Sequence, residues 1–391
     1  MKRLTFLTWL LAAINLVAQP EPQLGGVLKH DSTYEISVIY SEPVDVSTLS
    51  DIENYTVAPG SKSALRLCAT NQGAILTVDG LTSGDQGTLI VSNIQDTSGT
   101  VVPTADLDFH AIGRLWTGIG ANELGFPVDA YGLNTNGYDL ISGGIQQRDE
   151  YDDATFVAES LQGDFEVKVR VESVDAAGAG AKAGIMIREA LDAGKGRPLN
   201  PDDPTQAFSR YVELAVGAPV ALTGEANTGH QIWQRAVSPS LDTISLTVTN
   251  DAAPAFTNAW LRIVRSGQDF TMWRGVDGQS WDQIGSATFN PPLADTIYVG
   301  LAWCPQNDEV PGDQRGAFTA KFRDYSLTPK AASNLKIQML GDHAEVTWDA
   351  GWTLETAPII TGQWTNSVSQ QSPMRVDFTE GKRFYRLRQN Q

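Results

Sequence analysis

The sequence predicts an all-β protein. Apolar and polar residues alternate with period two along residues 34–40 and 165–171, which is the pattern of strands with one buried face. Short β-rich runs at 74–78 and 88–91 are separated by clusters of Gly, Pro, Ser and Asp, the residues that favour turns. The pair Asp277-Gly278 lies between two strand-like runs and indicates a tight hairpin, because Gly tolerates positive φ.

The composition excludes several classes of protein. The chain has 28 Lys and Arg against 46 Asp and Glu, a net charge of −18. Binding of phosphate backbones needs clustered Lys and Arg, so we expect no nucleic-acid partner. A hydrophobic content of 41% is sufficient for packed cores and argues against a disordered chain. Four His and two Cys leave little for a transition-metal site, and Cys68 and Cys304 are expected to be buried thiols.

Residues 1–18 have the features of a secretory signal peptide. Lys2 and Arg3 precede a mostly apolar run over 4–17, and the small residue Ala18 follows it. The run is too short and too poorly flanked for a membrane span. We therefore expect an exported protein, secreted or held at the cell surface, with no membrane insertion after removal of the signal.

Residues 24–104 are predicted to form the first β-sandwich. The segments SEPV at 41–44, NYTV at 54–57, VDGL at 78–81 and NIQDTSG at 93–99 occur in this order. Together they resemble bacterial surface Ig-like domains. The resemblance implies an Ig-like sandwich that acts as a spacer.

Residues 105–329 form the largest predicted domain. Five segments occur in order: GDFE at 163–166, AKAGIMIRE at 181–189, WLRIVRSG at 260–267, DGQSW at 277–281 and VGLA at 299–302. They resemble a family of exported bacterial proteins with a concanavalin A-like jelly roll. Relatives often carry a Ser-His pair after the last segment, where this chain has WCPQ at 303–306. The fold hosts glycan-binding modules, adhesion modules and glycosidases, so it does not by itself specify a function.

Residues 330–391 are predicted to be a small β-rich C-terminal module. The segments LETAP at 354–358, GQW at 362–364 and FYRL at 384–387 resemble a short module found in exported proteins of Verrucomicrobia-like bacteria. The expected chain is thus an Ig-like sandwich, a jelly roll and a small third β unit.

The densest acidic cluster is DEYDD at 149–153. Several carboxylates close together suit Ca²⁺, a hard cation that prefers oxygen ligands. The jelly-roll resemblance matches Asp152 to a recurrent Asp just before a strand. The candidate calcium ligands are Asp149, Asp152, Asp153 and, if the first and last strands lie together, Asp324. The alternative is a solvated acidic loop, and no cofactor is required by the sequence.

Aromatic side chains provide candidate carbohydrate contacts, because sugar faces stack on exposed rings. Trp233 is the leading candidate, since His230, Gln231 and Arg235 surround it in the sequence. Tyr131, Tyr138 and Tyr151 lie in turn-rich stretches and are further candidates. The expected partner is a polysaccharide or a cell-surface glycan.

The sequence favours a non-enzymatic function. Jelly-roll glycosidases of the laminarinase type carry a Glu-x-Asp-x-x-Glu run, which this chain lacks, and Glu166 alternates with Lys168 and Arg170 instead. No His-Glu-x-x-His or Gly-x-Ser-x-Gly motif occurs. The leading hypothesis is an exported protein whose jelly roll binds carbohydrate or a surface polymer. Two alternatives stay open: a glycoside hydrolase or lyase with carboxylates that converge from different strands, and a structural envelope or adhesion protein.

Overall fold

The all-β prediction is confirmed. A computed structural model describes residues 19–68, 72–111, 114–119, 124–133, 136–145, 147–148, 151–191, 209–218, 222, 229–236, 244–245, 254–294, 296–330, 335–348, 352–359, 362–377 and 383–389. The chain forms two compact units, and the second begins at Pro329. Helical turns in the described residues are short: α1 (Val46–Leu49), η1 (Ile52–Asn54) and η3 (Asn307–Glu309). None of the described helices is long and apolar enough to cross a membrane.

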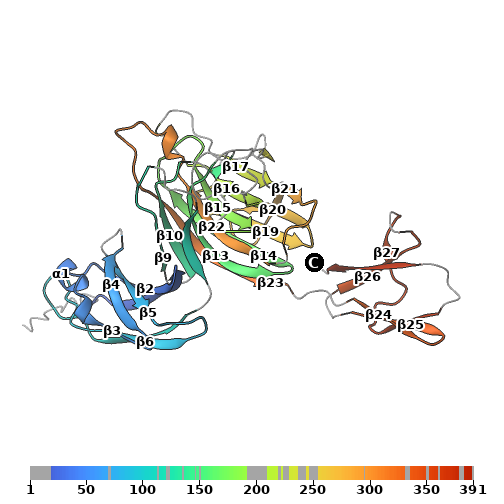
Figure 1. Ribbon diagram of the computed structural model, residues 1–391, viewed down its shortest axis with the longest axis horizontal. Coiled ribbons are helices and arrows are strands. Elements are labelled where there is room, and N and C mark those ends of the chain that lie inside the picture. The colour runs from blue at the N-terminus through green and yellow to red at the C-terminus, as the bar shows by residue number, and fades with distance from the viewer. Residues whose placement is uncertain are drawn as a thin grey trace, which may run out of the picture. The chain divides into compact units, whose positions relative to one another are not determined.

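The first unit starts with a β-sandwich that we call the N-terminal lobe (Figure 1). One of its sheets has the order β1 (Pro22–His30), β2 (Thr33–Tyr40), β5 (Gly73–Asp79), β4 (Ser61–Leu67). The other has the order β3 (Tyr55–Ala58), β6 (Gln86–Val91), β7 (Ala105–His110). Because β7 pairs with β6 along its whole length, this lobe extends through His110, and the predicted boundary at residue 104 falls one strand too early.

The rest of the first unit is the jelly roll, which has two antiparallel sheets. The first contains β18 (Ile244–Ser245), β17 (His230–Arg235), β16 (Tyr211–Val216), β15 (Lys182–Arg188), β22 (Thr296–Cys304), β13 (Ala154–Gln162) and β8 (Leu115–Ile119) in this order. It continues into β1, β2, β5 and β4 of the N-terminal lobe as one eleven-stranded sheet, because Lys29 on β1 pairs with Leu115 on β8. The second contains β21 (Asp282–Thr288), β20 (Asp269–Gly275), β19 (Ala259–Ser266), β14 (Phe165–Val174), β23 (Phe318–Pro329), β10 (Gly137–Ser142) and β9 (Asp129–Leu133). A short hairpin of β11 (Gln147–Arg148) and β12 (Tyr151–Asp152) precedes β13.

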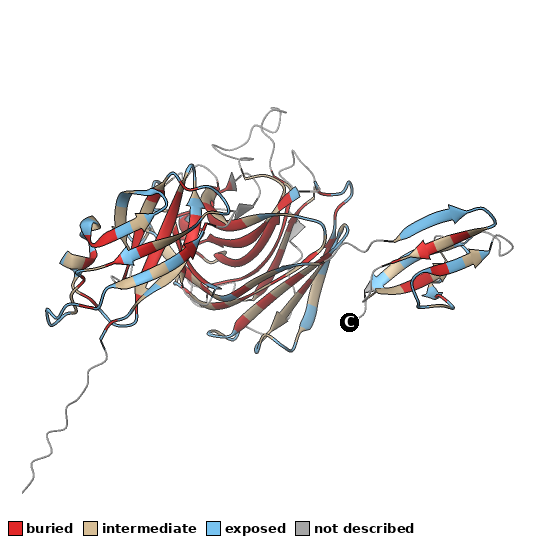
Figure 2. Cartoon of the chain, turned by 90° about the horizontal axis from the view of Figure 1, so that it is seen from below, coloured by how far each residue is buried: buried red, intermediate tan, exposed pale blue. Residues whose placement is uncertain are grey.

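Two patterns of burial distinguish the sheets of the jelly roll. On β14 the residues Phe165, Val167 and Val169 are fully buried, whereas the charged residues between them are partly exposed. On β15 and β16 every residue is buried. Figure 2 shows several strands of the first unit that are buried along most of their length. Strands β15 and β16 therefore bury both of their faces, and one face carries the polar side chains described below.

Two glycines of the jelly-roll motifs permit close packing of the first sheet. A Cβ atom on Gly184 would lie 2.1 Å from the carbonyl oxygen of Leu214, and one on Gly300 would lie 1.9 Å from that of Val157. Both distances are far below van der Waals contact, so neither position accepts a larger residue without displacement of the backbone. The motifs AKAGIMIRE and VGLA thus encode sheet packing.

The N-terminal lobe is fixed to the jelly roll by buried polar contacts. Glu35 on β2 accepts two hydrogen bonds from Arg66, at 2.8 and 2.9 Å, and one of 2.7 Å from Nε1 of Trp116 on β8. Arg66 also donates to Asp129 on β9 (3.1 Å). Gly26 of β1 lies so close to Gly132 of β9 that a Cβ atom added to Gly26 would be 3.0 Å from the Cα of Gly132. The lobe is therefore part of one compact unit with the jelly roll.

We expect Trp116→Phe to destabilise this junction by about 2 kcal/mol, because Glu35 is buried and would lose a hydrogen bond to its charged carboxylate. Urea unfolding of the full chain measures the loss. Trp273→Phe is the matched control, since the buried Nε1 of Trp273 has no hydrogen-bond partner in the described structure. Equal losses in the two variants would contradict the assigned role of Glu35.

The second unit consists of two small sheets around Val346, Trp348, Leu354 and Met374. Their strand orders are β24 (Lys336–Leu340), β25 (His343–Thr347), β28 (Met374–Asp377), and β27 (Thr365–Asn366), β26 (Trp352–Ala357), β29 (Phe384–Gln389). Glu355 on β26 accepts from Arg386 and Arg388 on β29, which ties the second sheet together. This unit is therefore β-rich, as its sequence predicts.

Candidate functional site

The strands β15, β16 and β17 present a polar face on the side of the first sheet that is turned away from the sandwich core. Alternate residues of β15 and β16, such as Ile185 and Leu214, belong to the core cluster. The residues between them point to the opposite side because side chains alternate along a strand. We call this the β15–β17 face, and its members are Lys182, Met186, Arg188, Tyr211, Glu213, Gln231, Trp233 and Arg235.

The strand register places the polar members next to one another. Glu213 lies opposite Met186 on β15 and opposite Trp233 on β17. Tyr211 lies opposite Arg188 on one side and Arg235 on the other. Directly opposed side chains in antiparallel strands are neighbours, with Cβ atoms roughly 5 Å apart. The face therefore brings together a carboxyl group, two guanidinium groups and two aromatic rings.

Asp152 is the counter-ion of both arginines of this face. Its carboxylate accepts from Nη2 of Arg188 at 3.2 Å and from Nη1 and Nη2 of Arg235 at 3.0 Å each. All three side chains are fully buried. Burial lowers the pKa of Arg188, and the adjacent Asp152 carboxylate opposes that shift. Because both oxygens of Asp152 are occupied by guanidinium groups, its predicted role as a calcium ligand is corrected to that of a structural anion.

Glu213 is the least satisfied ionisable group of the face. Its side chain is fully buried, and neither carboxyl oxygen has a hydrogen-bond partner in the described part of the chain. Burial raises the pKa of Glu213 to about 7, and the positive charge of Lys182 opposes the shift. At neutral pH the group is consequently divided between its acid and its carboxylate form.

Trp233 is the aromatic platform beside Glu213. Its ring is partly exposed, and the ammonium of Lys182 lies 4.5 Å from the ring centroid. The indole Nε1 donates a hydrogen bond of 3.0 Å to Oε1 of Gln231, which fixes the ring. Cys304 lies opposite Lys182 on β22, and burial raises the pKa of its thiol far above neutrality. Cys304 is therefore a buried thiol, as the sequence predicts.

The structure places two of the predicted carbohydrate contacts elsewhere. Tyr131 is buried at the junction of the lobes, where it packs with Cys68 and Ile75. Tyr138 is buried in the jelly-roll core, and its ring meets that of Tyr325 edge to face at 5.9 Å. Buried rings cannot stack on a sugar, so both predictions are corrected. Their turn-rich neighbourhoods suggested exposure because sequence alone does not show that two lobes meet there.

Two further candidate calcium ligands, Asp153 and Asp324, are held by different parts of the chain. Asp153 is buried and accepts from the backbone N–H of Ile145 at 3.3 Å. Asp324 lies on β23 of the second sheet, where it accepts from Nε of Arg170 at 2.6 Å. The described residues contain no group of three or more His, Cys, Asp and Glu side chains suited to a metal ion. Asp149 and the side chain of Tyr151 lie outside the described residues.

Sequence reasoning overlooked Glu213, Lys182 and Arg188. A usable signal existed for Glu213, which is the one charged residue in the run YVELAV at 211–216. A charge within a strand that is otherwise apolar on both faces indicates a buried polar site. Lys182 and Arg188 stand at the two ends of another such strand, but the sequence does not show that these strands are neighbours.

No protein-family model and no curated protein matches this sequence. Among solved structures, a protein of unknown function from Saccharomyces cerevisiae is 15% identical, with 56% of this chain and 98% of that chain covered and a TM-score of 0.36. Basic winged bean lectin is 13% identical, with coverage of 55% and 97% and a TM-score of 0.32. A β-glucanase of Bacillus licheniformis is 11% identical, with coverage of 56% and 92% and a TM-score of 0.30. Nothing about ligand or activity follows from these likenesses.

The fold and the face together define the class of this protein. It is an all-β protein with a jelly-roll sandwich whose first sheet carries a buried ionisable cluster beside a fixed tryptophan ring. The cluster combines a buried carboxyl group whose pKa is raised to about 7, one partly exposed aromatic ring and the three cations Lys182, Arg188 and Arg235. These are groups for the recognition of a polar ligand.

Proposed function

We propose that the β15–β17 face of the jelly roll binds carbohydrate. The observation that carries the proposal is the carboxyl group of Glu213, which has no hydrogen-bond partner among the described residues and lies beside the partly exposed ring of Trp233. A buried polar group without a partner costs about 1–3 kcal/mol. A sugar hydroxyl both donates and accepts hydrogen bonds, so it satisfies Glu213 in either protonation state.

Trp233 supports the same ligand class. The C–H face of a pyranose ring is apolar and is buried favourably against an aromatic surface. Because Gln231 holds the indole in place, little side-chain entropy is lost on binding. We further propose that the protein acts outside the cell as a non-enzymatic binder of a polysaccharide or cell-surface glycan, as its predicted signal peptide favours.

A glycan-array screen of the full chain, followed by calorimetric titration of the strongest glycan, tests the proposal. We expect Trp233→Ala to weaken binding at least about tenfold, because a tryptophan that stacks on a ligand contributes a large share of the binding free energy. Trp364→Ala is the matched control, since the ring of Trp364 likewise lies 4.5 Å from a cation, Arg386, but in the second unit. Absence of binding to every glycan, or equal binding by both variants, would refute the proposal.

One observation favours a glycoside hydrolase as the second candidate. A carboxyl group with a pKa of about 7 is protonated often enough near neutrality to serve as a general acid. Hydrolysis also requires a second carboxylate, and Asp152, whose charge acts on Glu213, is held by Arg188 and Arg235. We therefore favour binding. Release of reducing ends from the bound glycan that is abolished by Glu213→Gln would establish the hydrolase instead.

A further inference from the structure

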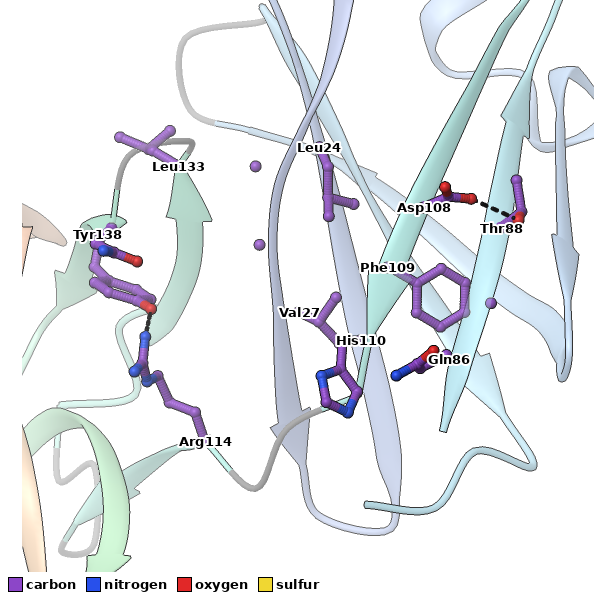
Figure 3. Close-up of a pocket in the computed structure, with 14 residues that line it drawn as sticks. Leu24, Val27, Gln86, Thr88, Asp108, Phe109, His110, Arg114, Leu133 and Tyr138 are labelled. Atoms are coloured by element: carbon purple, nitrogen blue, oxygen red, sulfur yellow. Dashed lines mark hydrogen bonds between the residues drawn. The ribbon is translucent and has the colours of Figure 1, made fainter. Parts of the chain in front are cut away.

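A groove of about 950 Å³ lies within the first unit where the N-terminal lobe meets the jelly roll (Figure 3). Strands β1, β6 and β7 line it from the N-terminal lobe with Leu24, Gln86, Asp108 and His110. Asn136 and Tyr138 line it from the jelly roll. Its volume is within the range of pockets that hold small organic ligands. Neither lobe alone forms this groove.

The jelly-roll wall of the groove is held rigidly. Arg114 donates to the hydroxyl of Tyr138 and, through Nε, to Glu159 at 2.8 Å. Its guanidinium also lies 5.3 Å from the centroid of Tyr138 and 5.0 Å from that of Tyr325. The guanidinium of Arg114, which lines the groove, is therefore already paired with the carboxylate of Glu159.

The remaining polar side chains of the groove are available to a ligand. Gln86, His110 and Asn136 are exposed and make no side-chain hydrogen bond with the described residues. Gln86 and His110 lie opposite each other on β6 and β7, so their amide and imidazole groups are neighbours that can contact the same ligand. Each of these groups can both donate and accept hydrogen bonds. Leu24 and Val27 add an apolar strip in the middle of the groove (Figure 3).

We propose that this groove is a second ligand site, separate from the β15–β17 face, for an uncharged hydroxyl-rich ligand such as a short oligosaccharide. Amide and imidazole groups match vicinal hydroxyls, which also donate and accept. The one lining cation is neutralised by Glu159, and the lining carboxylate of Asp108 accepts from Thr88 at 2.9 Å. An anionic ligand would therefore find no unpaired cation among these lining residues. An extended peptide at the open edge of β7 is the competing occupant.

The test uses the full-length Trp233→Ala protein, in which the first proposed site is disabled. Cellohexaose, laminarihexaose, xylohexaose and maltohexaose are titrated by calorimetry, together with an eight-residue Thr-Val repeat peptide flanked by Lys. We expect one hexasaccharide to bind with a stoichiometry of one. Gln86→Ala combined with Asn136→Gly is expected to weaken it about tenfold, the effect of one or two lost hydrogen bonds.

The substitutions are matched to the backbone. Asn136 has φ of 57°, so glycine removes its amide without backbone strain. Asn93 has the same φ and lies in the N-terminal lobe outside the groove, so Asn93→Gly is the control and should leave the affinity unchanged. No hexasaccharide binding to the Trp233→Ala protein, binding of the peptide alone, or equal affinity of the groove variant and the control would overturn the proposal. Glycan binding to the wild-type protein that Trp233→Ala leaves unchanged, and that the groove variant loses, would instead refute the site proposed around Trp233 while this one stands.

Discussion

Replacement of Asp152 by Asn should lower the free energy of unfolding of the first unit by about 4 kcal/mol. The variant keeps the shape of the side chain but removes the negative charge that Arg188 and Arg235 share in a fully buried site. Loss of one partner from a buried ion pair typically costs about 3–5 kcal/mol, because the opposite charge stays desolvated. In a thermal scan this corresponds to a melting temperature lower by about 10 °C.

Asp324→Asn is the matched control for this prediction. Asp324 also pairs with an arginine, but its side chain is 45% exposed, and such pairs contribute less than about 1 kcal/mol. Its φ of 57° is one that Asn adopts readily. Equal melting temperatures of the two variants would show that the ion pairs of Asp152 do not stabilise the β15–β17 face more than an exposed ion pair does.

Replacement of Glu213 by Gln should stabilise the protein in alkaline solution and leave it unchanged in acid. The folded protein raises the pKa of Glu213 from 4.5 to about 7. Between these pH values the folded state retains a proton that the unfolded state has released, so the stability of the wild type falls as pH rises through this window. The difference amounts to about 3 kcal/mol above pH 7.

Urea unfolding of both proteins from pH 4 to pH 8.5 measures this effect. The free energy of unfolding of the variant minus that of the wild type should be near zero at pH 4. This difference should reach its full value just above pH 7. Glu166→Gln is the control, because Glu166 is partly exposed and pairs with Arg262 at 2.7 Å. A difference that does not change with pH would show that Glu213 is hydrated or paired in the folded protein.

The fold was predictable because its signals are local. Alternation along 165–171 encodes one buried face of a strand, and the glycines of AKAGIMIRE and VGLA mark close contact between strands. The extent of the N-terminal lobe was not predictable to the same degree. Strand β7 follows a turn-rich stretch and is recognised as part of that lobe only through its pairing with β6.

The candidate site was predictable only in part. Trp233 stands out in sequence through its polar neighbours, and the structure places it on the β15–β17 face. Asp152 was singled out for its acidic surroundings, yet its function depends on Arg188 and Arg235, which are 36 and 83 residues away along the chain. Long-range pairs of this kind leave no local sequence pattern. From the sequence alone, these charged residues are therefore expected to be exposed in loops or on strand faces.

The acidic composition of the chain likewise does not show how charges are grouped in the folded protein. A net charge of −18 predicts that no nucleic acid binds, but it does not describe the β15–β17 face, where Lys182, Arg188 and Arg235 accompany Asp152 and Glu213. A strongly acidic protein thus buries a cluster in which cations outnumber acids. The proposed recognition of a neutral sugar by this face would depend on hydrogen bonds and stacking rather than on the charge of the whole molecule.

Fluorine NMR of the full chain labelled with 5-fluorotryptophan tests the central claim most directly. The resonance of Trp233 is assigned from its loss in Trp233→Phe, and the strongest glycan from the array is then titrated. We predict that the Trp233 resonance shifts in proportion to the fraction bound, while those of Trp273 and Trp364 stay in place. A Trp233 resonance that remains unmoved while the glycan saturates the protein would contradict carbohydrate binding at the β15–β17 face.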